Sequence, residues 1–406
     1  MTICRENGIN KIDRFFFWFC VIDVFFAPYF YYITVCYSLP LVFVWFIMRN
    51  GRALAGKREI LLMMILLTMG TVLGLLSSPM YISDNISCYI QYMQMLMYYL
   101  LFYYYMSRNI INVEKVIFVF SIFVFVCVLT YFISFDMYVG IRSVFAHRFY
   151  MPGMDIYTGY RFGFIWADEN NIAYVMCAVF MFYQALSNKK MIHELFILMT
   201  TILVLIASAS TGGIIAFLFA WLVKIMLSIK LTRKLKINLG LSGLGVLILL
   251  TIVIIGLCIF GTSFLQKFNF NEIWEMTKYR VQQKMSAGGD SRGEIWKMFL
   301  SKKPIYYYLI CGTGARTTLD GIYRSTHNGV LYFIYAYGMV FLVLFVKCFF
   351  IPRKDIPIKK QVYLVPLFIG FFMNIMFEEV KISSIFMFMI VACACYFKTR
   401  ECEEIE

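Results

Sequence analysis

Long apolar runs separated by short polar segments dominate the chain, and this alternation limits what it can fold into. Hydrophobic residues make up 62% of the 406 positions and charged residues only 15%. Soluble domains carry about 25% charged residues. A run of about 20 apolar residues is long enough to cross a bilayer as a helix. The sequence therefore predicts an integral membrane protein.

We expect an all-α polytopic membrane protein with about 12 transmembrane helices in a single membrane domain, 1–406. The first apolar run, Phe15–Met48, would measure about 51 Å as one helix, which is too long for one crossing. Because Pro28 can end or kink a helix, the run is interpreted as two short spans that meet near Ala27-Pro28. The other expected spans are 60–78, 89–107, 116–135, 170–186, 193–208, 213–229, 239–260, 328–350, 361–378 and 382–397.

The basic residues give the orientation. The net charge is +14, and the basic residues stand in short clusters between apolar runs, a pattern typical of topology signals and of contact with anionic lipid. No basic helix or folded basic domain is left to bind nucleic acid, so membrane lipids are expected partners and nucleic acid is not. With both ends cytoplasmic, two large segments face outward: 136–169 and the loop 261–327.

The loop 261–327 is the larger of these segments. Positions 261–326 hold ten Lys/Arg against five Asp/Glu. Long loops are exempt from the positive-inside rule, so this charge needs another reason. Ile295, Phe299 and Lys303 recur every four residues, which predicts that the loop is partly helical.

His327 ends this loop at the mouth of an expected span and is the candidate acid–base residue. Histidine has an unperturbed pKa of about 6.5, which suits proton transfer near neutrality. The alternative is a helix-start residue with only local hydrogen bonds, beside Thr326 and Asn328 as caps.

Arginines of the two outward segments are candidates for binding phosphate. Arginine captures phosphate oxygens in pairs and keeps its charge, so several such groups could stabilise a leaving diphosphate. The alternative is solvated charge or contact with lipid head groups. The candidates for substrate binding are Arg161, Arg280, Arg292, Arg316 and Arg324, together with Asn328.

Other polar motifs give weaker signals. Asp168 and Glu169 could form an acid–base pair, but stabilisation of a helix dipole is the favoured interpretation. The Gly-x-Gly of Gly312-Thr313-Gly314 is interpreted as a tight turn. The outer loops hold no Asp-x-Asp or similar set of oxygen ligands, so neither a metal nor a cofactor is expected. Cys88 and Cys311 lie in outer segments, where a bridge between them is an alternative to free thiols.

Three motifs, in the order in which they follow one another along the chain, resemble those of the O-antigen polymerase and ligase superfamily. One is His327-Asn328 followed after nine residues by Gly338. The other two are Arg161-Phe162-Gly163 before Asn170-Asn171, and Arg292…Trp296…Pro304…Gly312-Thr313-Gly314. Two positions depart from the family pattern: Phe341 in the histidine motif, and Thr211-Gly212-Gly213, which lacks the arginine of the Ser-Arg-Gly found in many members.

The resemblance implies a glycosyltransferase with a GT-C-like fold in the bacterial inner membrane, with its active site facing the periplasm. The implied substrate is an undecaprenyl-diphosphate-linked oligosaccharide, whose repeat units are polymerised into O-antigen or a related surface polysaccharide. The arginines would hold the diphosphate, and His327 would accept the proton of the acceptor hydroxyl. A chain-length co-polymerase and a flippase of the same pathway are the implied protein partners. The alternatives are an O-antigen ligase that transfers the glycan to lipid A core and a polysaccharide transporter.

Overall fold

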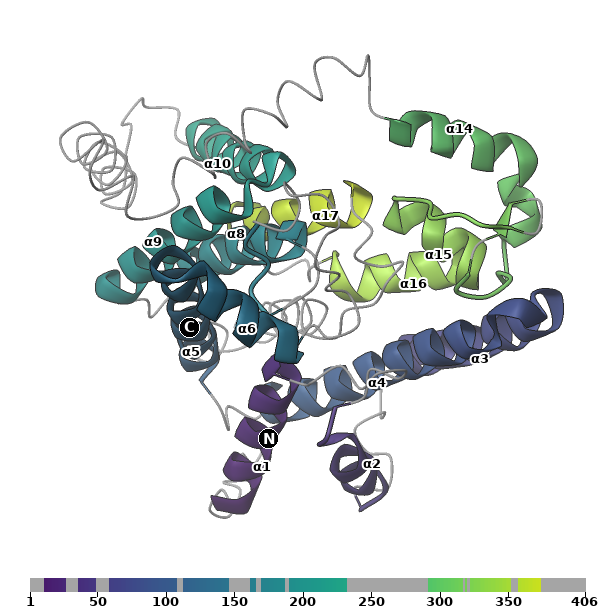
Figure 1. The fold of residues 1–406 in the computed structure, drawn as a ribbon, viewed down its shortest axis with the longest axis horizontal. Helices are drawn as coiled ribbons and strands as arrows, with labels where there is room; N and C mark the ends of the chain where they lie inside the picture. The colour runs from purple at the N-terminus through teal and green to yellow at the C-terminus, as the bar shows by residue number, and fades with distance from the viewer. Residues whose placement is uncertain are drawn as a thin grey trace.

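The computed structural model describes residues 11–26, 36–48, 58–107, 112–145, 161–165, 169–186, 190–231, 291–316, 318–319, 322–351 and 357–373. Within these ranges the protein is almost entirely helical, as expected (Figure 1). The one sheet in the described part is a short antiparallel hairpin of β1 (Thr318–Leu319) and β2 (Ile322–Tyr323).

Three of the described helices are long and apolar enough to cross a membrane: α3 (Arg58–Ser77), α5 (Val113–Ile133) and α9 (Met191–Ser208). The described part is therefore compatible with an all-α membrane protein. The helices α8 (Glu169–Ala185) and α10 (Thr211–Leu231) also coincide with expected spans. The expected spans 239–260 and 382–397 lie outside the described residues, so the total of about 12 stays a prediction.

The first apolar run forms two helices, α1 (Lys11–Phe26) and α2 (Leu39–Met48), and α1 ends beside the expected break at Ala27-Pro28. Asp23, a buried carboxylate of α1, accepts hydrogen bonds from the backbone N–H of Ser38 at 2.7 Å and from its hydroxyl at 2.6 Å. Ser38 immediately precedes α2, where backbone N–H groups lack helical partners and an anion is favoured. Asp23 thus fixes the start of α2 from a different helix.

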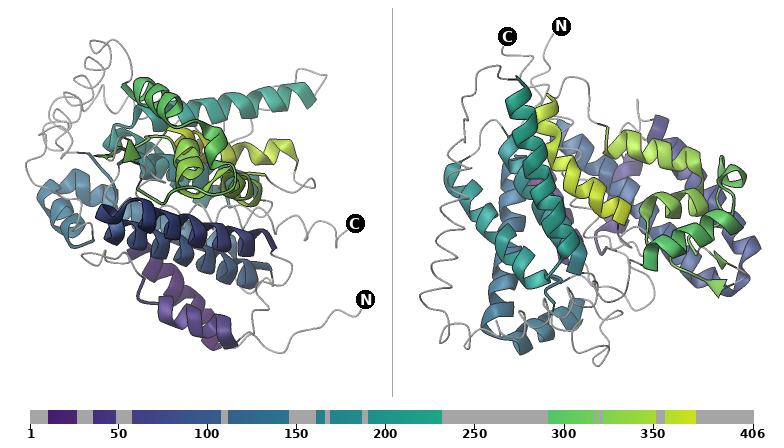
Figure 2. Two further views of the ribbon diagram at one scale, coloured as in Figure 1. Left: turned by 90° about the vertical axis from the view of Figure 1, so that its right-hand side faces the viewer. Right: turned by 90° about the horizontal axis from the view of Figure 1, so that it is seen from above.

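A 3-10 turn, η2 (Pro79–Tyr81), joins α3 to α4 (Ile82–Ser107), and the two helices lie side by side (Figures 1 and 2). Helix α4 begins seven positions before the expected start of its span at 89. Its first turns carry polar side chains such as Asn85 and Gln91, which lower the hydropathy but are buried against neighbouring elements. Burial of this kind is decided by tertiary packing, which hydropathy does not reveal.

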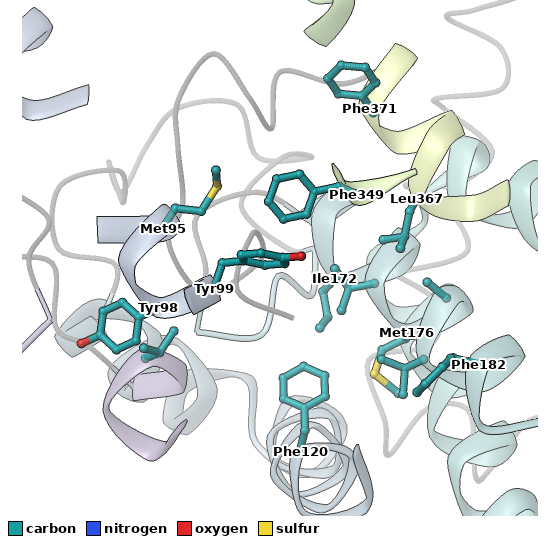
Figure 3. Packing of buried hydrophobic residues seen from close by; sticks show 14 of the residues in the cluster. Met95, Tyr98, Tyr99, Phe120, Ile172, Met176, Phe182, Phe349, Leu367 and Phe371 are labelled. Atoms are coloured by element: carbon teal, nitrogen blue, oxygen red, sulfur yellow. The ribbon is translucent and has the colours of Figure 1, made fainter. Parts of the chain in front are cut away.

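Helix α8 lies within the helical bundle. Its residues from Asn171 to Tyr183 are all buried, and it contacts α9, α10 and α17 (Leu364–Met373). A 3-10 segment, η4 (Ile358–Tyr363), precedes α17 and contacts α8 as well. The buried core beside α4, α8 and α17 combines aromatic with aliphatic and methionine side chains (Figure 3). Tyr99 of α4 packs edge-on there against Phe349, with ring centroids 5.0 Å apart.

The expected span 328–350 is broken into α15 (Gly329–Tyr337) and α16 (Met339–Phe349). Gly338 separates them with φ +97°, a conformation that favours glycine. A neighbouring segment satisfies backbone groups at the break: Thr313 N–H donates to Tyr335 O at 2.8 Å, and Val340 N–H donates to Leu309 O at 3.1 Å. The break is thus built from two distant parts of the chain.

The motif Gly312-Thr313-Gly314 lies outside helices and strands and packs against this break and against α3. A Cβ atom at Gly312 would lie 2.1 Å from the carbonyl carbon of Ala336, and one at Gly74 would lie 2.6 Å from the Cα of Gly314. Gly314 N–H donates to Ala336 O at 3.0 Å. The glycines are needed for close backbone approach as well as for the positive φ of Gly314, which the interpretation as a tight turn did not foresee.

The expected helix in the loop 261–327 is confirmed as α14 (Ser291–Lys302), followed by a 3-10 turn, η3 (Ile305–Tyr308). Phe299 is fully buried against Tyr335 of α15, with ring centroids 5.4 Å apart. This contact docks α14 onto α15. Cys88 and Cys311 are both free thiols.

Candidate functional site

Arg161 lies in a buried polar cluster between α6 (Phe135–Phe145), α8 and the end of α9. Its side chain is 3% exposed. The guanidinium donates to Ser208 O at 2.6 Å, to the Asn170 side-chain oxygen at 3.0 Å and to Glu169 Oε2 at 3.4 Å. A second arginine, Arg142 of α6, is 5% exposed and donates to Glu169 Oε1 at 2.8 Å. We name Arg142, Arg161 and Glu169 the arginine cluster.

The backbone around Arg161 is held by several hydrogen bonds. Phe162 N–H donates to Ala207 O at 3.0 Å, and Gly163 N–H donates to the Tyr138 hydroxyl at 2.8 Å. That hydroxyl in turn donates to Phe164 O at 3.1 Å. Burial raises the pKa of Tyr138 to about 12, although the charge of Arg142 opposes the rise, so the phenol stays neutral and able to donate.

Gly212 of Thr211-Gly212-Gly213 packs closely against Tyr174 of α8. A Cβ atom at Gly212 would lie 2.2 Å from the hydroxyl oxygen of Tyr174. Any side chain at position 212 would therefore displace Tyr174. Ser210, just before this motif, donates to the Asn170 side-chain oxygen at 2.9 Å and so supports the residue that holds Arg161.

Glu169 lies in the first turn of α8, where a carboxylate stabilises the helix dipole, as the sequence predicted. Its carboxylate is nevertheless bonded to two arginines, which the sequence did not suggest. Asp168, its expected companion, lies outside the described residues. Arg142 is one of the arginines of the segment 136–169 but was not singled out as a site residue, because its contact with Arg161 joins positions 19 apart that no linear motif links.

Replacing Arg161 with alanine is expected to destabilise the protein by about 3–5 kcal/mol, because it removes the buried donor of the Ser208 carbonyl and takes one of two donors from both Glu169 and the Asn170 side chain. Thermal unfolding of the purified protein in detergent measures this. Lys347→Ala is the control: Lys347 pairs with Glu59 at 2.9 Å but is 59% exposed, so about 0–1 kcal/mol is expected. Equal losses in both variants would contradict a structural role for the arginine cluster.

His327, the candidate acid–base residue, lies directly before α15 and apart from the arginine cluster in the sequence. Its φ of +48° is left-handed, which is uncommon for residues other than glycine. The flanking residues are fixed: Thr326 is fully buried, and Asn328 caps α15 by accepting from Val330 N–H at 2.9 Å and Leu331 N–H at 3.2 Å. The cap at Asn328, which belongs to the alternative interpretation of this motif, is confirmed, whereas its role in substrate binding stays a prediction. The left-handed turn presents the partly exposed imidazole at the start of the helix.

Trp296 of α14 holds the backbone next to His327. Its indole N–H donates to Thr326 O at 2.9 Å, and its ring packs edge-on against Phe372 of α17, with centroids 5.6 Å apart. Helix α14 therefore contributes to the geometry around the histidine. The sequence motif included Trp296 but gave no reason for it.

The remaining candidate arginines are distributed differently. Arg316 is partly buried and forms an ion pair with Asp84 at 3.3 Å, while its backbone N–H donates to Asn85 Oδ1 at 3.3 Å. Arg324 is exposed on the approach to His327. The backbone of Arg292 lies in the first turn of α14, but its side chain lies outside the described part, as does all of Arg280.

The arginine cluster and His327 flank the last turn of α17. A Cβ atom at Gly370 of α17 would lie 3.0 Å from the ring of Tyr174, one turn along α8 from Asn170. On the other side, a Cβ atom at Gly329 would lie 2.6 Å from Phe371 O. Since helix axes in contact lie about 8–10 Å apart, the axes of α8 and α15 are separated by at most about 20 Å.

Within the described ranges, no group of three or more His, Cys, Asp or Glu side chains could hold a metal ion. The described polar groups can hold an anion and accept a proton. No known protein-family model matches the chain, and no curated protein matches it.

Proposed function

We propose that the protein is a membrane glycosyltransferase that polymerises undecaprenyl-diphosphate-linked oligosaccharide repeat units into a surface polysaccharide. In this proposal about 12 spans with a GT-C-like arrangement cross the bacterial inner membrane, and the segments 136–169 and 261–327 face the periplasm. The observation that carries the proposal is the buried pair of arginines, Arg142 and Arg161, which share one carboxylate at the start of α8.

Guanidinium groups suit the proposed leaving group. A diphosphate gains charge as its bond to the anomeric carbon breaks, and fixed cations stabilise that charge without reorganising. Arg161 is fixed by Ser208, Asn170 and Glu169, so its position is set before a substrate arrives. In this role the arginines would take the place that a divalent cation has in other transferases, which makes the proposed transfer metal-independent.

His327 would act on the acceptor. A hydroxyl of an incoming lipid-linked repeat unit attacks the anomeric carbon of the growing chain, the bond from that carbon to the diphosphate oxygen breaks, and the hydroxyl proton passes to the imidazole. The undecaprenyl diphosphate leaves with the electron pair. Because Trp296 and Asn328 fix the backbone on both sides of His327, the imidazole position is set by α14 and α15.

The experiment uses the purified full chain in lipid vesicles with a fluorescent undecaprenyl-diphosphate-linked oligosaccharide. Polymerisation predicts longer glycans together with released undecaprenyl diphosphate. Transfer that occurs only when lipid A core is supplied would identify a ligase instead. Movement of intact substrate across the bilayer, with no new glycosidic bond, would refute the transferase and favour a transporter.

A further inference from the structure

The carboxylate of Glu169 bridges two guanidinium groups, each through a different oxygen. Oε1 accepts from Arg142 Nη2 at 2.8 Å, and Oε2 accepts from Arg161 Nη1 at 3.4 Å. Arginine binds phosphate through the same N–H groups that it offers to carboxylate. Glu169 therefore occupies the position that a phosphate group between these two arginines would take.

The two arginines have supports that do not depend on Glu169. Arg161 is held by Ser208 O at 2.6 Å and by the Asn170 side chain at 3.0 Å. Arg142 Nη1 donates to the backbone oxygen of Arg161 at 3.3 Å. If the Glu169 side chain turned away, both guanidinium groups would keep these bonds and stay in place.

Glu169 is the outermost member of the arginine cluster. Its side chain is 16% exposed, compared with 3% for Arg161 and 5% for Arg142. An incoming ligand reaches the arginines from the side of the carboxylate. Leaving two buried guanidinium groups without their bridging anion is costly, so the carboxylate is exchanged most easily for another anion. The N-terminus of α8 favours an anion beside the arginines, whether that anion is the Glu169 carboxylate or a phosphate group.

We propose that Glu169 is an internal competitor for the diphosphate of the lipid-linked substrate, and that Arg142 is the second diphosphate-binding residue beside Arg161. Diphosphate binding displaces the carboxylate, and the carboxylate returns to the arginines when undecaprenyl diphosphate is released. The identity of the anion rests on the proposed function, whereas the exchange itself rests on the geometry of the arginine cluster.

The test measures binding of inorganic pyrophosphate to the purified full chain by calorimetry. If the Glu169 carboxylate is bound to the arginines more than about nine-tenths of the time, less than about one-tenth of the protein can bind pyrophosphate. Glu169→Gln then raises the affinity for pyrophosphate at least about tenfold. The double variant Arg142→Gln/Glu169→Gln should lose this gain. Glu59→Gln makes the same charge change at an exposed ion pair and should leave the affinity unchanged.

Two results would overturn the inference: an unchanged affinity in Glu169→Gln, or a gain that persists when Arg142 is also replaced. Should Glu169→Gln fail to fold, Glu169→Asp keeps the charge but is too short to bridge both arginines, and an intermediate rise in affinity is expected. A short-chain polyprenyl diphosphate must show the same dependence on Glu169, because binding of inorganic pyrophosphate alone would contradict a lipid-linked ligand.

These results are independent of the assay for glycan synthesis. Tighter pyrophosphate binding that depends on Arg142, in a protein that makes no polymer, would support the exchange and refute the proposed function. Polymer synthesis with no effect of Glu169 on pyrophosphate binding would refute the exchange alone.

Discussion

Gly312→Ala is expected to prevent the protein from folding. A Cβ atom at this position would lie 2.1 Å from the carbonyl carbon of Ala336 and 2.3 Å from the backbone nitrogen of Tyr337. Both obstacles are backbone atoms of α15, so no change of side-chain rotamer relieves the clash. The segment that holds Gly312 would have to move away from the break at Gly338 and give up the hydrogen bonds from Thr313 and Gly314. Losses above about 4–5 kcal/mol are expected of such changes.

The measurement is the yield of monodisperse protein in detergent and its thermal unfolding. Gly293→Ala is the matched control, because a Cβ atom at Gly293 would meet nothing within 4 Å. Gly293 lies in α14, where alanine is the better helix former by about 1 kcal/mol, so the control should be neutral or slightly stabilising. A Gly312→Ala protein as stable as the Gly293→Ala protein would refute the close packing of this segment against α15.

His327→Asn is expected to reduce glycan polymerisation about 100- to 10,000-fold, the range over which a positioned acid–base group contributes. Asparagine is chosen because it tolerates the left-handed conformation that His327 adopts, whereas alanine would add strain. Folding should be unaffected, so thermal unfolding should stay within a few degrees of the wild type while unpolymerised lipid-linked units accumulate.

The alternative role of His327, a helix-start residue with local hydrogen bonds, makes the opposite prediction. Under it, His327→Asn would produce polymer of normal length. Asn328→Ala separates the two effects, because losing the cap of α15 costs about 0.5–2 kcal/mol and removes no proton acceptor. Because Asn328 is also a candidate for substrate binding, the activity per folded protein decides its role: an unchanged value leaves Asn328 with the cap alone.

Hydropathy was sufficient to locate most of the described helices, because lipid demands apolar side chains over a fixed length. It placed α3, α5 and α9 within a few residues. It did not place the break at Gly338, because the residues on either side remain apolar and the cause is a second segment that bonds to the same backbone. The span in α4 was predicted too short for a related reason: Asn85 and Ser87, which precede the expected start at 89, are polar yet buried.

The candidate site was predictable where a single residue carries the signal. The cap at Asn328 and the helix around Trp296 followed from local sequence. The pairing of Arg142 with Glu169 did not, since it brings together α6 and α8, whose contact is decided by the fold. Whether His327 and Arg161 serve one substrate stays a prediction, although α17 contacts both α8 and α15 beside these residues.

The hydrogen bonds of Thr313 and Gly314 to Tyr335 and Ala336 also bear on how the protein tolerates change in length. The stretch that carries His327 bonds to the C-terminal end of α15 through Thr313 and Gly314 and caps the N-terminal end of the same helix through Asn328, so both of its ends are tied to one helix. A change in length within this stretch would shift one of these two ties, so the imidazole keeps its register with α15 only at the present length.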